Sequence, residues 1–326
     1  MRNKKGLEFG FEWIFAVLIG GFVIFLAVYA ASKFIDSGNL QKGSEVGKEI
    51  GILLTPFETN LETGKTNYIT TKEETTIYND CNSAGDFGVQ NISAEVKSGF
   101  GDNVVRPGAI STYKNRYLFS EGKVTGKEFY VLSKPFEFPF KVGDLIIVWS
   151  EKQKYCFVDL GSYPEIKKDI NELGLKNVFN VTSVRDPNCP AGAIKVCFRG
   201  TDRECNMTVD GTSVTHRESG GDKTVYYPRL DNNALLYAAI FSKPDIYDCQ
   251  IKRLMNRALN IAKLYEEKSV FLGQRGCGAP RLNAFFTNYE NKVNGVAGPN
   301  NPDITRAEAA AEELGRENGY LICPIF

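Results

Sequence analysis

Eight cysteines carry the most evident chemistry of this chain of 326 residues. They are Cys81, Cys156, Cys189, Cys197, Cys205, Cys249, Cys277 and Cys323. An even number of cysteines, all in the later part of the chain, is typical of a disulfide framework in an oxidising exterior. The alternative is a set of reduced, buried thiols in a cytosolic domain. Because no two cysteines form a CxxC pair and His216 is the only histidine, the sequence predicts no metal site.

Cys277 and His216 are candidates for nucleophilic catalysis. Arg275 lies close to Cys277 in the chain, and a basic neighbour favours a reactive thiolate. A disulfide from Cys277 to Cys249 or Cys323 is nevertheless the expected state. Any Ser-His or Cys-His pair would have to use His216, but its polar neighbours and the glycines that follow predict an exposed loop histidine.

Asp231 is the candidate for an acidic pocket. It follows a predicted strand, Thr224–Pro228, and precedes the apolar segment Ala234–Phe241. In open α/β sheets, ligands bind at the carboxyl ends of the strands, which is where this carboxylate is expected. An Asx turn that caps the next helix is the alternative. We find no sequence motif for a cofactor.

Two kinds of surface feature are also present. Asn91, Asn180 and Asn206 begin Asn-x-Ser/Thr triplets, which accept glycans if the chain is exported. Phe136, Phe138 and Phe140 alternate with other residues next to prolines, and prolines confine such a segment to an edge strand. These three rings form either an exposed aromatic strip for a partner or part of the core.

An apolar segment from Trp13 to Ser32 positions the rest of the chain. It holds about 20 residues without a charge, and a helix of that length spans the roughly 30 Å hydrocarbon core of a bilayer. Arg2, Lys4 and Lys5 precede it, and such a basic flank favours a cytoplasmic N-terminus. We therefore expect a retained anchor in the plasma membrane with the bulk of the chain outside. A cleaved signal ending near Ala30-Ala31-Ser32 is the alternative.

The sequence divides into three regions. Residues 1–35 form the transmembrane anchor, residues 36–150 a β-rich membrane-proximal region, and residues 151–326 an α/β ectodomain. The predicted fold class is α/β, with α+β as the alternative. The polar segment after the anchor is expected to form a short stalk or a continuation of the anchor helix.

The C-terminal region shows the clearest element pattern. Tyr155–Leu160 and Asn177–Thr182 flank a predicted helix that ends near Gly174, which makes a βαβ unit with parallel strands. Ala193–Phe198 and Asn206–Val209 predict a hairpin across which Cys197 and Cys205 face each other. Apolar residues at helical spacing from Tyr247 to Tyr265 predict a long core helix.

The N-terminus resembles that of archaeal type IV pilin-like proteins. The resemblance rests on Lys4-Lys5-Gly6 followed by a long hydrophobic helix, and it ends near Lys33. It implies cleavage after Gly6 by a membrane peptidase, with the helix retained as an assembly core. The layout as a whole is similar to that of uncharacterised single-pass envelope proteins of archaea with small genomes.

Two functional hypotheses follow. Because the sequence lacks a catalytic constellation, it favours a membrane-anchored extracytoplasmic structural or interaction protein of the cell envelope over an enzyme. The alternative is a membrane-tethered ectoenzyme, hydrolase-like, with a carboxylate site near Asp231. The formal net charge of zero argues against a nucleic-acid partner. The expected partners are the membrane, other envelope proteins, or a second copy that packs through small residues of the anchor.

Overall fold

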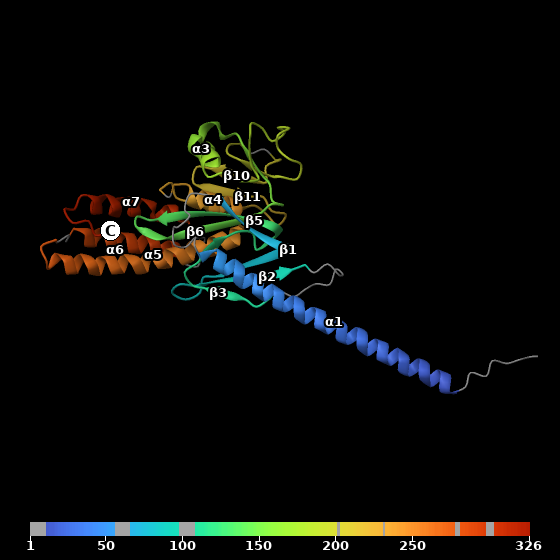
Figure 1. The fold of residues 1–326 in the computed structure, drawn as a ribbon. Helices are drawn as coiled ribbons and strands as arrows, with labels where there is room; N and C mark the ends of the chain where they lie inside the picture. Colours follow the sequence, from blue (N-terminus) through green and yellow to red (C-terminus); the bar gives the residue numbers. More distant parts are fainter. Residues whose placement is uncertain are drawn as a thin grey trace, which may run out of the picture.

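Two mixed β-sheets, a buried helix between them and a long projecting N-terminal helix make up the α/β fold (Figure 1). This computed structural model describes residues 11–55, 66–97, 108–200, 203–230, 232–277, 281–297 and 303–326. The elements in chain order are α1 (Phe11–Leu53), β1 (Thr66–Asn82), β2 (Val89–Val96), β3 (Ser111–Tyr113), β4 (Tyr117–Phe119), β5 (Lys123–Glu137), β6 (Lys141–Ser150), β7 (Tyr155–Val158), the 3-10 helix η1 (Leu160–Ser162), α3 (Pro164–Glu172), β8 (Val178–Val181), β9 (Ile194–Cys197), β10 (Met207–Asp210), β11 (Ser213–His216), β12 (Lys223–Tyr226), α4 (Ala234–Phe241), α5 (Pro244–Gly273), α6 (Leu282–Ala297) and α7 (Thr305–Gly319).

The anchor segment and the stalk are one continuous helix, α1. Its segment Trp13–Lys33 has 21 residues and a mean hydropathy of 2.6, and it is not buried by the rest of the chain, so its length and composition suffice to cross a membrane. The last turns of α1 pack on β2. Gly43 allows this approach, because a Cβ there would lie 2.7 Å from the carbonyl oxygen of Ala94. Ile50 and Leu54 bury their side chains against the same sheet.

The first sheet is formed by β1 to β6 in the order β3-β2-β1-β5-β6-β4. Its pairs are antiparallel except that of β4 with β6. One face covers the end of α1, and the other face contributes to the core beneath α4 and α5. This sheet therefore connects the anchor helix to the rest of the head.

The second sheet has the order β12-β11-β10-β9-β7-β8 and confirms the βαβ unit. β7 and β8 pair in parallel, with Tyr155 opposite Val178, and α3 connects them. The predicted hairpin is wrong, because β9 and β10 also pair in parallel, with Met207 opposite Val196. The connection between them returns the chain to the same end of the sheet, and the Cys197–Cys205 disulfide closes that connection.

Helix α4 lies between the two sheets with every side chain buried. The ring of Phe241 stacks on Trp149 of the first sheet at 4.5 Å and meets Tyr155 of the second edge-on at 4.6 Å. The last carbonyls of a helix have no partner within it. Here the Ser242 hydroxyl donates to one of them, and Nε2 of His216 donates to the carbonyl of Ala239 at 2.9 Å.

The expectation of an exposed loop histidine is therefore wrong. His216 lies on β11 and is only 5% exposed. Burial lowers the pKa of its imidazole, which makes it a neutral donor to α4 at pH 7 rather than a solvent-facing base.

The expectation of an exposed aromatic strip is also wrong. Phe136, Phe138 and Phe140 lie at the turn of the β5–β6 hairpin and are buried. The arm of helices formed by α6, α7 and the distal half of α5, together with the C-terminal tail, covers this turn. Phe326 of the tail meets Phe140 at 5.3 Å, and the hydroxyl of Tyr289 donates to the carbonyl of Phe138.

All eight cysteines form disulfides, as expected for an oxidised head. The pairs are Cys81–Cys249, Cys156–Cys189, Cys197–Cys205 and Cys277–Cys323. Cys277 takes one of its two expected partners and is not a free nucleophile. The Cys81–Cys249 bond joins segments 168 residues apart and ties β1 to α5.

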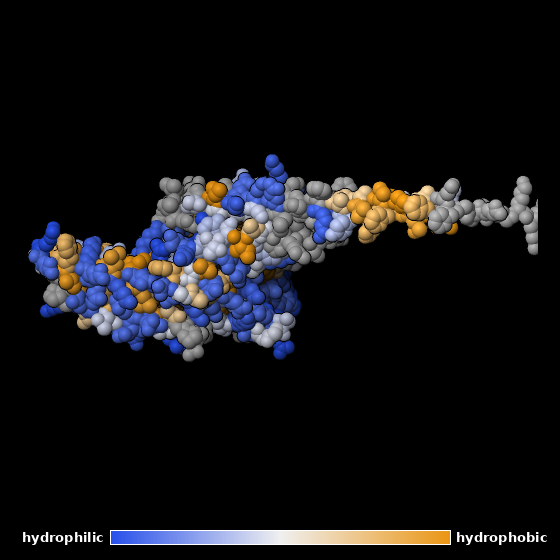
Figure 2. All heavy atoms as spheres, turned by 90° about the horizontal axis from the view of Figure 1, so that it is seen from below, coloured by the Kyte–Doolittle hydropathy of each residue, from blue (hydrophilic) through white to orange (hydrophobic). Residues whose placement is uncertain are grey.

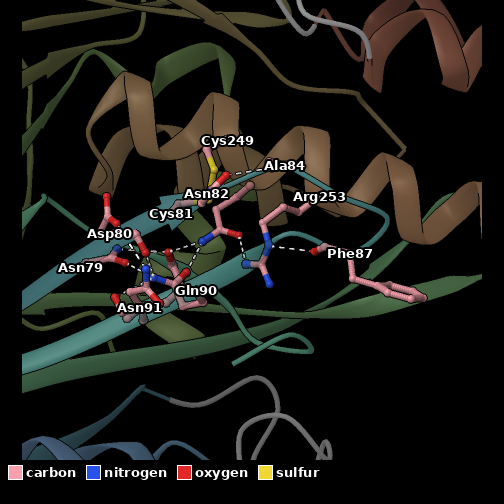
Figure 3. The surroundings of a disulfide bond; sticks show 12 residues. Asn79, Asp80, Cys81, Asn82, Ala84, Phe87, Gln90, Asn91, Cys249 and Arg253 are labelled. Carbon is pink, nitrogen blue, oxygen red and sulfur yellow. Dashed lines mark hydrogen bonds between the residues drawn. A yellow bond between two sulfur atoms is a disulfide. The ribbon is translucent and has the colours of Figure 1, made fainter. Parts of the chain in front are cut away.

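A buried arginine on α5 reinforces that connection (Figure 3). Arg253 is fully buried, and its guanidinium donates to the carbonyls of Phe87 at 3.1 Å, Arg116 at 2.8 Å and Lys114 at 2.9 Å. It also donates to Gln250 at 2.7 Å. Gln250 continues the network to Gln90, Asn79 and Ser120 on the first sheet. Backbone carbonyl dipoles thus surround the buried charge.

We expect Arg253→Met to destabilise the head strongly. Methionine restores much of the buried volume but leaves three or more carbonyls without a donor, and each buried unpaired group costs about 1–3 kcal/mol. The free energy of unfolding from chemical denaturation should fall by about 3 kcal/mol or more. The matched control is Lys263→Met, at an exposed position of the same helix, which should change it by less than about 0.5 kcal/mol. Equal effects of the two substitutions would contradict the role assigned to Arg253.

Candidate functional site

The candidate site is a cavity of about 550 Å³ at the carboxyl edge of the second sheet. β7, β9, β10 and β12 all run toward this edge. Helix α3 begins there, with Tyr163 at its N-cap and Pro164 in its first turn. This is the position at which open α/β sheets bind ligands.

The segment before α4 forms one wall of the cavity. Asn232 and Asn233 both line it, and both have left-handed backbones, with φ of 51° and 62°. Asparagine tolerates this conformation better than most residues, which explains the pair at this turn. Asp231 itself lies outside the described residues, so the structure places its neighbours on the cavity wall and not its carboxylate.

The described lining combines cationic and polar groups. Arg199 follows β9, Arg229 follows β12, and both side chains are exposed at the cavity. The ring of Tyr163 packs edge-on against Phe198 at 5.3 Å, which fixes that wall. Glu165 is the one carboxylate among the described lining residues. Two guanidinium groups beside a helix N-terminus can bind an anionic group, whereas glycoside hydrolysis, for example, uses a pair of carboxylates.

A partly buried ion pair behind the cavity was not anticipated. Nζ of Lys134 lies 3.0 Å from Oδ2 of Asp169, and it donates to the carbonyl of Asn232 at 2.7 Å. The hydroxyl of Tyr237 donates to the same carboxylate at 3.1 Å, and burial raises the pKa of that hydroxyl. These contacts connect β5, α3 and α4 and so position two walls of the cavity. The sequence does not reveal this ion pair, because Lys134 lies beside Pro135 in a strand and its partners Asp169 and Asn232 are 35 and 98 residues away in the chain.

A second cavity, of about 500 Å³, lies beside the Cys81–Cys249 disulfide. Asp80, Asp245, Asp248 and Lys252 line it. Lys223 pairs with Asp245 at 2.8 Å. Oδ1 of Asp248 is buried without a hydrogen-bond partner among the described residues. Among all the residues that the structure describes, no three His, Cys, Asp or Glu side chains are arranged to hold a metal ion.

The three glycan candidates occupy different environments. Asn91 lies inside the first sheet, and its side chain bonds to Asp80 and Thr112. Asn180 is exposed on β8, the edge strand of the second sheet. Asn206 is exposed, and its Oδ1 accepts a hydrogen bond from the backbone of Lys195. Asn180 and Asn206 are thus more accessible acceptors than Asn91.

Comparison of the chain with family models, curated proteins and solved structures gives no match. A functional proposal must therefore rest on the geometry of this chain.

Asp248 should make the stability of the head depend on pH. Burial raises the pKa of its carboxyl to about 6, Lys252 and Lys223 lower it, and Asp245 raises it. Because the folded pKa exceeds the unfolded value, ionisation of Asp248 destabilises the fold as pH rises from about 4 to about 6. We expect Asp248→Asn to be about 1–2 kcal/mol more stable than the native chain at pH 7. This difference should shrink toward zero by about pH 4.

Denaturation of both proteins across this pH range tests the shift. Comparing the two chains cancels the contribution of His216, which has the opposite sign because its pKa is lowered. A stability difference that does not change with pH would show that Asp248 titrates normally.

Proposed function

We propose that this chain is a membrane-anchored extracytoplasmic structural or interaction protein of the cell envelope. One observation carries the proposal: an apolar helical segment of 21 residues that is not buried by the fold continues unbroken into a head with four disulfides. The exposed apolar surface of α1 is visible apart from the head in Figure 2. A hydrocarbon environment removes that surface from water, and an oxidising compartment preserves the disulfides.

The helix also supports a short, stiff link between membrane and head. From Lys33 to Gly43 a rise of about 1.5 Å per residue gives roughly 15 Å. Gly43 is already in contact with the first sheet, so this sheet would lie close to the headgroups. The described chain between the two points is helical throughout.

The ectoenzyme alternative has less support. The cavity lies where the sequence predicted a ligand, but its described lining holds two arginines and one carboxylate. Cys277 is in a disulfide and His216 donates to a helix carbonyl. Neither residue is available as a nucleophile or a base, so the arrangement supports binding more than hydrolysis.

Labelling of intact cells with a membrane-impermeant amine reagent tests the topology. We expect modification of exposed head lysines such as Lys72, Lys127 and Lys167, and protection of Lys4 and Lys5 until the cells are lysed. Peptide mass spectrometry locates the label. The reverse pattern, with the head protected in intact cells, would contradict the proposal.

The pilin-like resemblance supports one variant of this function. In it residues 1–6 are removed and copies of the chain pack through the small residues Ala16, Gly20, Ala27 and Ala31. We expect N-terminal sequencing of the chain from native membranes to begin at Leu7. A chain that begins at Met1 would contradict this variant and leave the anchored function intact.

A further inference from the structure

We propose that the membrane-distal end of the head inserts apolar side chains into a second, opposing lipid membrane. The chain would then bridge two membranes, an inference that rests on the proposed anchoring through α1. The side chains are Val270 and Phe271 at the end of α5, and Tyr320 and Ile322 in the tail after α7, which we call the distal patch.

The distal patch is unusually exposed for its composition. Ile322 is 101% exposed and Tyr320 is 74% exposed, while about half of each remaining side chain is accessible. Scattered apolar residues on a surface are ordinary, but an apolar group gathered at one end of a molecule indicates a contact site. In Figure 2 the arm of helices carries orange side chains among blue ones.

The backbone under the patch is held in place. Cys323, beside Ile322, is joined to Cys277 beyond the end of α5. Ile325 is buried, and its carbonyl accepts a hydrogen bond from Lys268 at 2.6 Å. The side chain of Asn318 donates to the carbonyl of Phe326 at 2.6 Å. The tail therefore presents Ile322 to solvent while both of its ends are fixed, so little conformational freedom is lost on binding.

The position of the patch argues for an opposing surface. Helices α5, α6 and α7 project from the sheets on the side away from the apolar segment of α1 (Figure 1). The 30 residues of α5 span about 45 Å at the usual helical rise. Among the described parts of the head, the end of this arm lies farthest from the anchor.

Size and charge favour lipid as the occupant. A stable protein dimer buries about 800 Å² on each partner, which four side chains at a projecting tip do not supply. Apolar side chains enter hydrocarbon individually, and a tyrosine ring favours the headgroup region. The charged residues of this part of α5 and the segment after it are of both signs: Glu266 and Glu267 are acidic, Lys268 and Arg275 are basic, and the Arg275 guanidinium lies 4.6 Å over the ring of Phe271. Binding should therefore depend on apolar insertion and not on attraction to anionic lipid.

Vesicle capture tests the inference. The full-length chain is reconstituted into phosphatidylcholine vesicles with one dye and mixed with protein-free phosphatidylcholine vesicles with a second dye. Fluorescence cross-correlation then measures capture. We expect capture that persists between about 0.1 M and about 1 M salt, and that falls about tenfold or more in Ile322→Asp.

The matched control is Ile110→Asp. Ile110 is 66% exposed but directly precedes β3, an edge strand of the sheet that packs on α1. It therefore lies away from the distal patch, and capture should be unchanged. Unfolding of both variants shows whether the head stays folded. The inference would be overturned by an equal loss of capture in both variants or by capture only with anionic lipid. Clustering only between protein-bearing vesicles would also overturn it, because the occupant would then be a second copy of the chain. Absence of capture by heads that amine labelling shows to be outside would overturn it and leave the anchoring proposal standing.

Discussion

The structure depends on a pair of arginines that connects the anchor helix to the longest helix of the head. Arg253 of α5 donates to the carbonyl of Arg116, and the guanidinium of Arg116 donates to the carbonyl of Gly51 near the end of α1, each at 2.8 Å. Both arginines are buried. Desolvating two cations is costly, and it is tolerated here because main-chain carbonyls accept their hydrogen bonds. This requirement fixes the connection before β4 relative to both helices.

The other parts of the head are arranged around that connection. The Cys81–Cys249 disulfide lies next to it and joins β1 to α5 covalently. Beyond this point α5 continues into the arm, where α6 packs on it and α7 packs on α6. The Cys277–Cys323 disulfide joins the tail to the segment that follows α5. The orientation of the arm relative to α1 is thus fixed by the contacts of α1 with the first sheet and of that sheet with α5. Such a chain of stiff contacts suits a protein that holds a surface at a set distance from a membrane.

Elements with strong local periodicity were predictable from the sequence, and their environments were not. The apolar N-terminal helix, the βαβ unit after Tyr155 and the long helix after Pro244 each carry a local pattern, and the structure contains all three. Phe136, Phe138 and Phe140 show the limit. Their alternation is the same whether water or a later segment of the chain faces them, and it is the arm of helices and the C-terminal tail that bury them. His216 is a similar case, because a polar neighbourhood in sequence does not reveal that α4 needs a donor for Ala239. The cavity's edge was predictable because Asp231 follows a predicted strand, but Arg199, Arg229 and the pair Lys134–Asp169 come from separate elements without any shared signal.

The central claim is that an oxidised, cross-connected head stands outside the membrane. The most direct test is peptide mapping under non-reducing conditions, on protein from native membranes that are treated with an alkylating agent before lysis. The account predicts four linked peptide pairs, Cys81 with Cys249, Cys156 with Cys189, Cys197 with Cys205 and Cys277 with Cys323, and no alkylated cysteine. Alkylated Cys81 and Cys249 would contradict it, because reduced thiols would place the head in a reducing compartment and remove the covalent connection between β1 and α5.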